Sequence, residues 1–395
     1  MSDEDDRSLS GESWRRWCDR LKAVGDRILE SDFPIDERAR AEGYRALTRL
    51  IASATQSELE AANPDFPEFI AEQGPRSPWG GANPDFVTLK AVIDPRQTYK
   101  IWADVDGMFQ ATFFQHDGAP ALERTRTYYE RHLESFEVDE DGFLELILSP
   151  EEHAGNWIPS HREARFFTIR IVVSDWESHT APTFHIERAG AEGEAPDPVS
   201  AAEVARGLER SIEWIEKSSA YWHRHAHEAS EKAPVNTGSA LSVEPGDPSD
   251  IMTGRCFWNL AEDEALLITC EVPVARYWGF AIQTMNWFES GDFARRQTSL
   301  SGDQIHLDGD GRARLVLSAQ DPGVPNWIDS EGRPEGLLAY RVGWAKTSPL
   351  PIPGIERVQV EGIYARLPDD HPVITDDERR DRLCLRREAL WNRFA

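Results

Sequence analysis

The chain has 395 residues, of which 40% are hydrophobic, and it carries 43 lysines and arginines against 70 aspartates and glutamates. The formal net charge of −27 argues against nucleic acid and anionic membranes as partners, because both bind clusters of basic side chains. The acidic start MSDEDDRSLSGES lacks the features of a secretory signal, and no apolar run is long enough to span a bilayer, so we expect a cytoplasmic protein.

The N-terminal part of the chain is predicted to be helical. Apolar residues recur at three- and four-residue steps from Trp14 to Ile28, which predicts an amphipathic helix. A second helix is expected after Pro34, with Tyr44 and Leu47 on its buried side. Together they define an N-terminal helical region over residues 1–81.

The pattern then changes to short strand-like runs such as VTLKAVI, TYKIWADV and FFTIRIVV, which predict an antiparallel β module over residues 82–190. A long helix capped by Ser200 and Glu203 and a linker rich in Pro, Gly and Ser follow over 191–250.

Runs such as ALLITCEVP, RARLVLS, LLAYRVGW and RVQVEGIYARL predict a second module over 251–368, before a C-terminal helix over 369–395 capped by Thr375 and Glu378. The expected fold is mainly β with flanking α-helices, built from two related antiparallel jelly-roll-like β-sandwich modules.

The two modules share a sequence pattern. GNWIPSHREARFFTIRIV from Gly155 matches PNWIDSEGRPEGLLAYRV from Pro325, and the upstream VDEDGFLELILS from Val138 matches LDGDGRARLVLS from Leu307. The shared residues include Asn-Trp-Ile at 156–158 and 326–328 and an arginine at 170 and 341. Such self-similarity indicates an internal duplication of one β unit.

Several of these segments resemble a known group. WGGANPDFVTLKAVID followed by YKIWAD, then DPGVPNWIDSEGRPEGLLAYRVGW and VQVEGIYARLP, resemble the bacterial domain-of-unknown-function family twelve-fourteen, some of whose members carry a companion domain, twelve-fifty-four, upstream. The closest match covers residues 257–367. The resemblance implies jelly-roll-like β-sandwiches and no settled reaction. Family motifs usually have a tyrosine soon after Asn-Pro-Asp, where this chain has Phe86 and Val87.

Arg170 and Arg341 are candidate ligand-binding residues. Each lies on the less apolar face of its strand, and a guanidinium with five fixed donors suits a carboxylate or phosphate. They therefore predict an anion or hydroxyl clamp at the mouth of each sandwich. The alternative is structural, with each arginine binding a carboxylate of a neighbouring loop such as Asp139 or Asp308.

The Asn-Trp-Ile motifs permit two interpretations as well. Asn156, Trp157, Asn326 and Trp327 are candidate ligand-binding residues because tryptophan can stack on a flat ligand. The structural alternative is that asparagine caps its turn and tryptophan closes the end of the sandwich. Asp321 and Asp329 flank the second motif and form a candidate catalytic pair. If one copy is active, we therefore favour the second.

Metal sites are not predicted. His223 and His227 have the spacing of two zinc ligands on a helix, but the glutamate of a protease signature is misplaced, so we expect a solvated helix face. The DGDG sequence at Asp308 lacks the later acidic ligands of a calcium loop and indicates a hairpin turn. The four scattered cysteines suggest neither a disulfide framework nor a zinc ribbon, and we expect no cofactor.

Three functions remain open. The preferred one is binding of a small apolar or hydroxylated ligand with an acidic group in a groove lined by Trp and Arg, either between the sandwiches or against the helices. The second is a hydrolase or lyase that uses Asp321 and Asp329 near Arg341. The third is an assembly protein, such as a homo-oligomer, whose edge strands pair with another chain.

Overall fold

The computed structural model describes residues 10–30, 36–124, 126–244 and 247–394. The chain is mainly β with flanking α-helices, as predicted. It divides into two compact units, one made of Met1–Trp79, Val87–Val172 and Thr180–Trp222, the other of Gly80–Phe86, Val173–His179 and His223–Ala395. Each β module forms the body of one unit. Two short segments that precede residue 190 in the chain, 80–86 and 173–179, also belong to the second unit.

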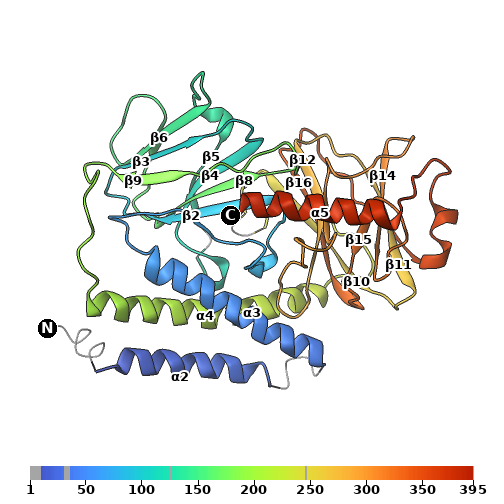
Figure 1. Cartoon of the computed structure of the whole chain (residues 1–395), viewed down its shortest axis with the longest axis horizontal. Helices are drawn as coiled ribbons and strands as arrows, with labels where there is room; N and C mark the ends of the chain where they lie inside the picture. Colours follow the sequence, from blue (N-terminus) through green and yellow to red (C-terminus); the bar gives the residue numbers. More distant parts are fainter. Residues whose placement is uncertain (1–9, 31–35, 125, 245–246, 395) are drawn as a thin grey trace. The chain divides into compact units, whose positions relative to one another are not determined.

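The first unit contains helices α2 (Glu12–Arg27) and α3 (Glu37–Thr55) and most of α4 (Ala201–Ser230), which lie along one side of its sheets (Figure 1). Ser200 and Glu203 cap α4 through reciprocal hydrogen bonds, as predicted. The predicted burial of Tyr44 is wrong, because this side chain is 42% exposed while Leu47 and Leu50 form the buried stripe of α3.

Two sheets form the first β module. One has the order β1 (Ile70–Ala71), β2 (Phe86–Val92), β8 (Phe166–Val172), β4 (Gln110–His116) and β5 (Thr127–His132). The other has the order β7 (Trp157–Pro159), β6 (Phe143–Ser149), β3 (Tyr99–Asp104) and β9 (His185–Arg188). Alternation of side chains along the strands buries one face of each sheet, where Phe113, Ile169, Ile101 and Leu146 are fully enclosed.

Two sheets also form the second module. One has the order β10 (Ile251–Asn259), β16 (Glu335–Gly343), β12 (Tyr277–Gln283) and β13 (Ser299–Ser301). The other has the order β15 (Trp327–Asp329), β14 (Arg312–Ser318), β11 (Glu264–Glu271) and β17 (Gly354–Gln359). A single hydrophobic cluster joins them, with Phe280 and Leu338 from the first sheet and Leu266 and Leu315 from the second.

The C-terminal part of the second unit differs from the prediction in one segment. The expected strand over RVQVEGIYARL ends at Gln359, and two 3-10 turns follow, Val360–Gly362 and Tyr364–Arg366. Helix α5 (Asp376–Arg393) begins with the predicted capping box of Thr375 and Glu378.

The same strand arrangement recurs in both modules. In each, a short parallel strand pairs with a longer one, and the registers agree: Leu148 lies opposite Ile158, and Leu317 lies opposite Ile328. The two arginines of the repeated pattern lie on the corresponding strands β8 and β16, each between two neighbours of its sheet. Arg170 lies opposite Thr112, the third residue of β4, and Arg341 lies opposite Gly279, the third residue of β12.

Candidate functional site

The asparagines of the repeated motif bind backbone groups. Asn156 Nδ2 donates to the carbonyl oxygens of Glu137 (2.7 Å) and Glu145 (3.0 Å), and its Oδ1 accepts from the Glu137 N–H (2.8 Å). Asn326 makes the same three contacts, with the His306 and Arg314 carbonyl oxygens at 2.7 and 2.9 Å and the His306 N–H at 2.8 Å. These amides are engaged with the backbone, which favours the structural interpretation.

The tryptophans of the motif are anchored in the same way. Trp157 Nε1 donates to the Ser149 carbonyl oxygen at 3.1 Å, and Trp327 Nε1 donates to that of Ser318 at 3.2 Å. Trp327 is 8% exposed, and the guanidinium of Arg379 lies 5.1 Å from its ring centroid. The second copy of the motif is therefore enclosed.

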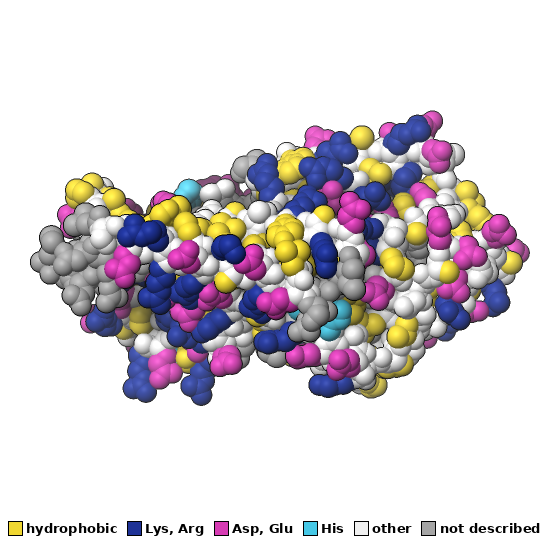
Figure 2. Space-filling model, turned by 90° about the horizontal axis from the view of Figure 1, so that it is seen from below, with side chains coloured by type: hydrophobic (Ala, Val, Ile, Leu, Met, Phe, Trp, Pro, Cys, Tyr) yellow, Lys and Arg dark blue, Asp and Glu magenta, His cyan; other side chains and the backbone are white. Residues whose placement is uncertain are grey.

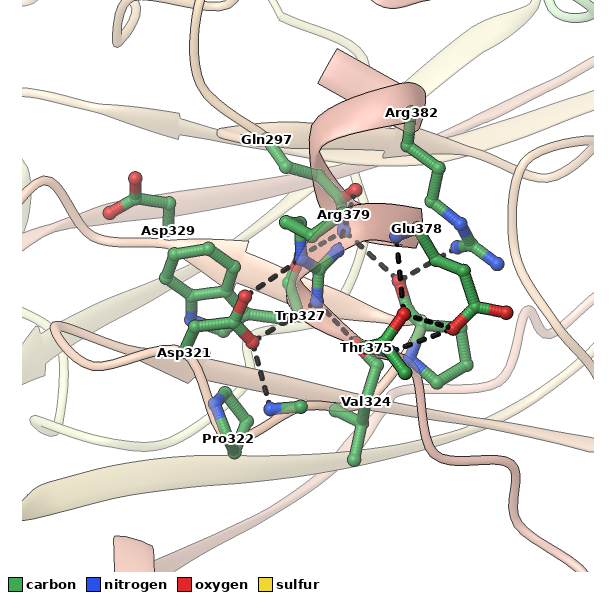
Figure 3. A network of polar contacts seen from close by, with 12 residues as sticks. Gln297, Asp321, Pro322, Val324, Trp327, Asp329, Thr375, Glu378, Arg379 and Arg382 are labelled. Atoms are coloured by element: carbon green, nitrogen blue, oxygen red, sulfur yellow. Dashed lines mark hydrogen bonds and ion pairs between the residues drawn. The ribbon is translucent and has the colours of Figure 1, made fainter.

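The two candidate catalytic aspartates are held by different arginines. Asp321 accepts from Arg379 Nε (2.8 Å) and Nη2 (3.1 Å), and Asp329 accepts from Arg296 Nη1 (2.7 Å). Figure 3 shows Asp321 directed at Arg379, whereas Asp329 lies beside Trp327 and points away from Asp321. Their role as a catalytic pair stays a prediction, and these contacts favour structural roles for both.

The two arginines of the pattern have different neighbours. The guanidinium of Arg170 lies 5.7 Å from the Phe114 ring, and Arg341 Nη2 donates to the Gly81 carbonyl oxygen at 3.3 Å. The loop carboxylates have other partners, because Asp139 accepts from the backbone of its own turn and Asp308 pairs with Arg314 at 2.6 Å. A clamp at either arginine remains a prediction.

The expectation of a solvated face at the histidine pair is wrong for His223, which is 8% exposed. Its Nδ1 lies 2.8 Å from the Asn286 carbonyl oxygen, and His227 Nε2 lies 3.1 Å from Asn286 Oδ1. Both imidazoles thus hold the loop that contains Asn286. The DGDG sequence forms a turn, as expected, in which Gly311 N–H donates to the Asp308 carbonyl oxygen at 2.8 Å.

A hollow of about 500 Å³ lies between α2 and α4 of the first unit, and we call it the α2–α4 hollow. Its apolar floor contains Trp17, Leu208 and Ile212, which are 8%, 8% and 1% exposed. Trp17 is fixed by a hydrogen bond from its Nε1 to Ser211 Oγ at 3.0 Å, and Trp14, 57% exposed, stacks on it at 5.4 Å. The floor is therefore aromatic, aliphatic and largely buried, and the exposed ring beside it is that of Trp14.

The rim of this hollow is rich in arginine. Arg16, Arg206 and Arg210 line it together with the carboxylates of Glu12 and Glu209. Glu209 is already bound by Arg20 at 2.6 Å and by Arg16 at 3.6 Å. Three arginines and two glutamates line the hollow, and Arg210 Nε also pairs with Glu58 at 3.4 Å.

Charged side chains on this side of the molecule are mixed. Figure 2 shows Lys and Arg interspersed with Asp and Glu on the face that it draws, with hydrophobic side chains among them. The lining of the hollow is likewise mixed, with Arg16, Arg206 and Arg210 beside Glu12 and Glu209 around an apolar floor. Such a site suits a small anion with an apolar body better than a polyanion.

The α2–α4 hollow was not predicted from the sequence, although part of its pattern is visible there. Arg206 and Arg210 are four residues apart, and Leu208 and Ile212 are also four residues apart, so each pair lies on one side of α4. Arg16 and Trp17 are adjacent on α2. Which face of α4 meets α2 depends on tertiary packing, and sequence spacing alone does not provide it.

A buried polar cluster in the second unit was also missed. Asp85, 1% exposed, accepts hydrogen bonds from Trp176 Nε1 and Tyr277 Oη, both at 2.8 Å, and burial raises the pKa of this carboxyl. The guanidiniums of Arg386 and Arg393 lie 4.1 and 4.4 Å from the Trp176 ring centroid. Both carboxyl oxygens are occupied, so this cluster serves to hold segments 80–86 and 173–179 on the second sandwich.

Comparisons with known proteins inform the fold alone. No protein-family model and no curated protein match the chain. Among solved structures, an uncharacterised protein from Burkholderia cenocepacia has a TM-score of 0.82 and 26% identity, covering 91% of this chain and 99% of that one. The VPA0106 protein from Vibrio parahaemolyticus has a TM-score of 0.46 and 11% identity, covering 80% of this chain and 98% of that one. The first similarity supports the architecture described above.

Proposed function

We propose that this protein binds a small apolar molecule that carries an acid group, and that the site is the α2–α4 hollow. The observation that carries the proposal is the combination of an apolar floor at Trp17, Leu208 and Ile212 with a rim on which arginines outnumber carboxylates. A volume of about 500 Å³ lies within the range of small-molecule sites. Arginine suits the acid group because its fork donates two parallel hydrogen bonds to a carboxylate.

The proposed orientation follows from the chemistry of the lining. The apolar body of the ligand packs on Trp17 and Leu208, and the acid group meets Arg16, whose side chain is 60% exposed and only 3.6 Å from Glu209. Arg210 is held by the carbonyl oxygen of Glu58 at 2.8 Å, which fixes its side chain at the rim. Ligand binding would therefore need little rearrangement of this arginine.

Three further expectations belong to this proposal. The matching registers and asparagine contacts support an internal duplication of one β unit. The segments WGGANPDFVTLKAVID and VQVEGIYARLP support membership of the domain-of-unknown-function family twelve-fourteen. Among the described residues, no helix combines the length and apolar character needed to cross a membrane; we retain a cytoplasmic location as part of the proposal.

The test is a calorimetric titration with 2-naphthoate, which joins a flat apolar body to one carboxylate, against the neutral 2-naphthamide of similar size. We expect 2-naphthoate to bind and the amide to bind at least about tenfold more weakly, because hydrogen bonds to charged groups are worth roughly 1.5–3 kcal/mol. Arg16→Ala should weaken naphthoate binding by a similar factor.

Arg15→Ala is the matched control, since Arg15 is on the same helix and its guanidinium contacts the Ser10 carbonyl oxygen at 3.0 Å. It should leave the affinity unchanged. Equal affinity for the acid and the amide, or equal losses in the two variants, would reject the proposed site.

A further inference from the structure

The outer face of sheet β7-β6-β3-β9 differs from its counterpart in the second module. In the second module, Leu267 lies opposite Val316, and Val316 lies opposite Trp327. These three side chains are at most 8% exposed and cluster with Ile363 and Leu367, so the segment after β17 covers this face.

The first module has the same pairings with other side chains. Lys100 lies opposite Ile147, and Ile147 lies opposite Trp157. Lys100 is exposed, and Ile147 and Trp157 are only partly buried. The first module therefore leaves accessible a sheet face that the second module covers with its own chain.

Two hollows on this face meet at an aromatic pair. Trp102 of β3 and His185 of β9 are opposite each other in register and stack with centroids 5.3 Å apart and planes at 19°. Both residues line a hollow of about 560 Å³ and a second one of about 590 Å³. The pair thus stands between two adjoining small-molecule-sized spaces.

The linings of the two hollows combine apolar side chains with groups that donate and groups that accept hydrogen bonds. The first is lined by Asp65, Glu187 and Arg188, and the second by Asp104 and Thr180. Carboxylates accept hydrogen bonds from hydroxyl groups, arginine donates them, and threonine does both. Arg188 is itself bound to Glu194 at 3.3 Å, so the hollow has no excess of cations that would select an acid.

We propose that this face binds a neutral saccharide of several linked sugar units. Sugar rings have apolar C–H faces that pack on flat aromatic side chains, and their hydroxyls pair with the carboxylates of the rim. Two spaces joined at Trp102 and His185 suit a chain of rings better than one ring. This saccharide site is on β3 and β9, whereas the α2–α4 hollow is formed by two helices. Its ligand has no acid group, so the saccharide site goes beyond the function proposed above.

The experiment is affinity electrophoresis of the full chain in native gels that contain soluble amylopectin, xylan, galactomannan or hydroxyethylcellulose. We expect retardation by at least one polysaccharide. Trp102→Ala should remove it or weaken the affinity about tenfold, as expected for loss of an aromatic contact. His185→Ala, at an exposed position, is the second variant and should also reduce retardation.

Trp14→Ala is the matched control, because it removes an exposed tryptophan that stacks on Trp17 of α2, away from this sheet face, and should leave retardation unchanged. The Trp102→Ala protein should still bind 2-naphthoate, which shows that it is folded and separates the two proposals. Lack of retardation in all four gels, or retardation that survives both variants, would overturn the saccharide site.

Discussion

Asn156 and Asn326 make the same three hydrogen bonds to backbone in the two modules, each joining one loop segment to the carbonyl oxygen of a neighbouring strand residue. Beside them, Trp157 and Trp327 donate to equivalent serine carbonyl oxygens. The repeated sequence therefore makes the same backbone contacts in both modules, where it joins its loop to a neighbouring strand. Its residues are engaged with the protein itself, which is why we place the ligand elsewhere.

Replacement of Asn156 and of Asn326 by alanine should lower the free energy of unfolding by different amounts. Asn326 is fully buried, whereas Asn156 is partly exposed, so water can replace its contacts. We expect Asn326→Ala to lower the free energy of unfolding by about 3 kcal/mol, because buried backbone groups lose their partners, and Asn156→Ala by about 1 kcal/mol. Urea denaturation followed by fluorescence measures both; equal losses would contradict the difference in burial.

Arg379 should matter for the docking of α5. Its guanidinium donates to Asp321, to the Gln297 side chain at 2.9 Å and to the Val324 carbonyl oxygen at 2.5 Å. Arg379→Ala leaves these acceptors without their donor and should destabilise the fold by about 3 kcal/mol. Arg380→Ala, at an exposed position of the same helix, should cost less than about 0.5 kcal/mol. Similar thermal midpoints for the two variants would show that α5 does not depend on this network.

His116 should make stability depend on pH. Its Nδ1 donates to the Gly118 carbonyl oxygen at 2.7 Å, and its Nε2 lies 2.8 Å from Thr168 Oγ1. Burial lowers the pKa of His116 from 6.5 to about 4, with Glu72 opposing and Lys90 adding to the shift. The unfolded chain therefore takes up a proton between pH 6.5 and pH 4 that the folded chain does not bind, and stability falls as the pH falls through this window.

The size of this effect is about 3 kcal/mol at most, because each pKa unit corresponds to about 1.4 kcal/mol. Urea denaturation at a series of pH values measures it. His116→Gln should be less stable near neutral pH but lose less stability on acidification than the natural chain. If the free energy of unfolding falls equally with decreasing pH in the natural chain and in His116→Gln, other groups cause the acid sensitivity.

Much of the fold could be predicted from local patterns. The capping boxes at Ser200 and Thr375 and the alternation along FFTIRIV identify their elements, because both signals depend only on neighbouring residues. Short strands such as β7 and β9 were missed, since three or four residues carry too little periodicity. The segment after Gln359 was wrongly predicted to be a strand because its apolar residues cover an outer sheet face instead of pairing within a sheet.

The candidate sites could be predicted only in part. The motif occurs in both modules, but the role of a side chain depends on its partners, and Asp321 is bound by Arg379 from another element 58 positions away. Asp85 and Tyr277 are 192 residues apart, and no local pattern relates them. The pairing of α2 with α4 likewise depends on a contact between Trp17 and Ser211, which are 194 positions apart.

The central claim is that the α2–α4 hollow binds an apolar acid, and a crystal structure with 6-bromo-2-naphthoate tests it most directly. The anomalous signal of bromine locates the ligand without reference to its surroundings. We predict a bromine peak over Trp17 and Leu208 with the carboxylate within hydrogen-bonding distance of Arg16. A peak at another site, or no peak in crystals grown with saturating ligand, would contradict the account.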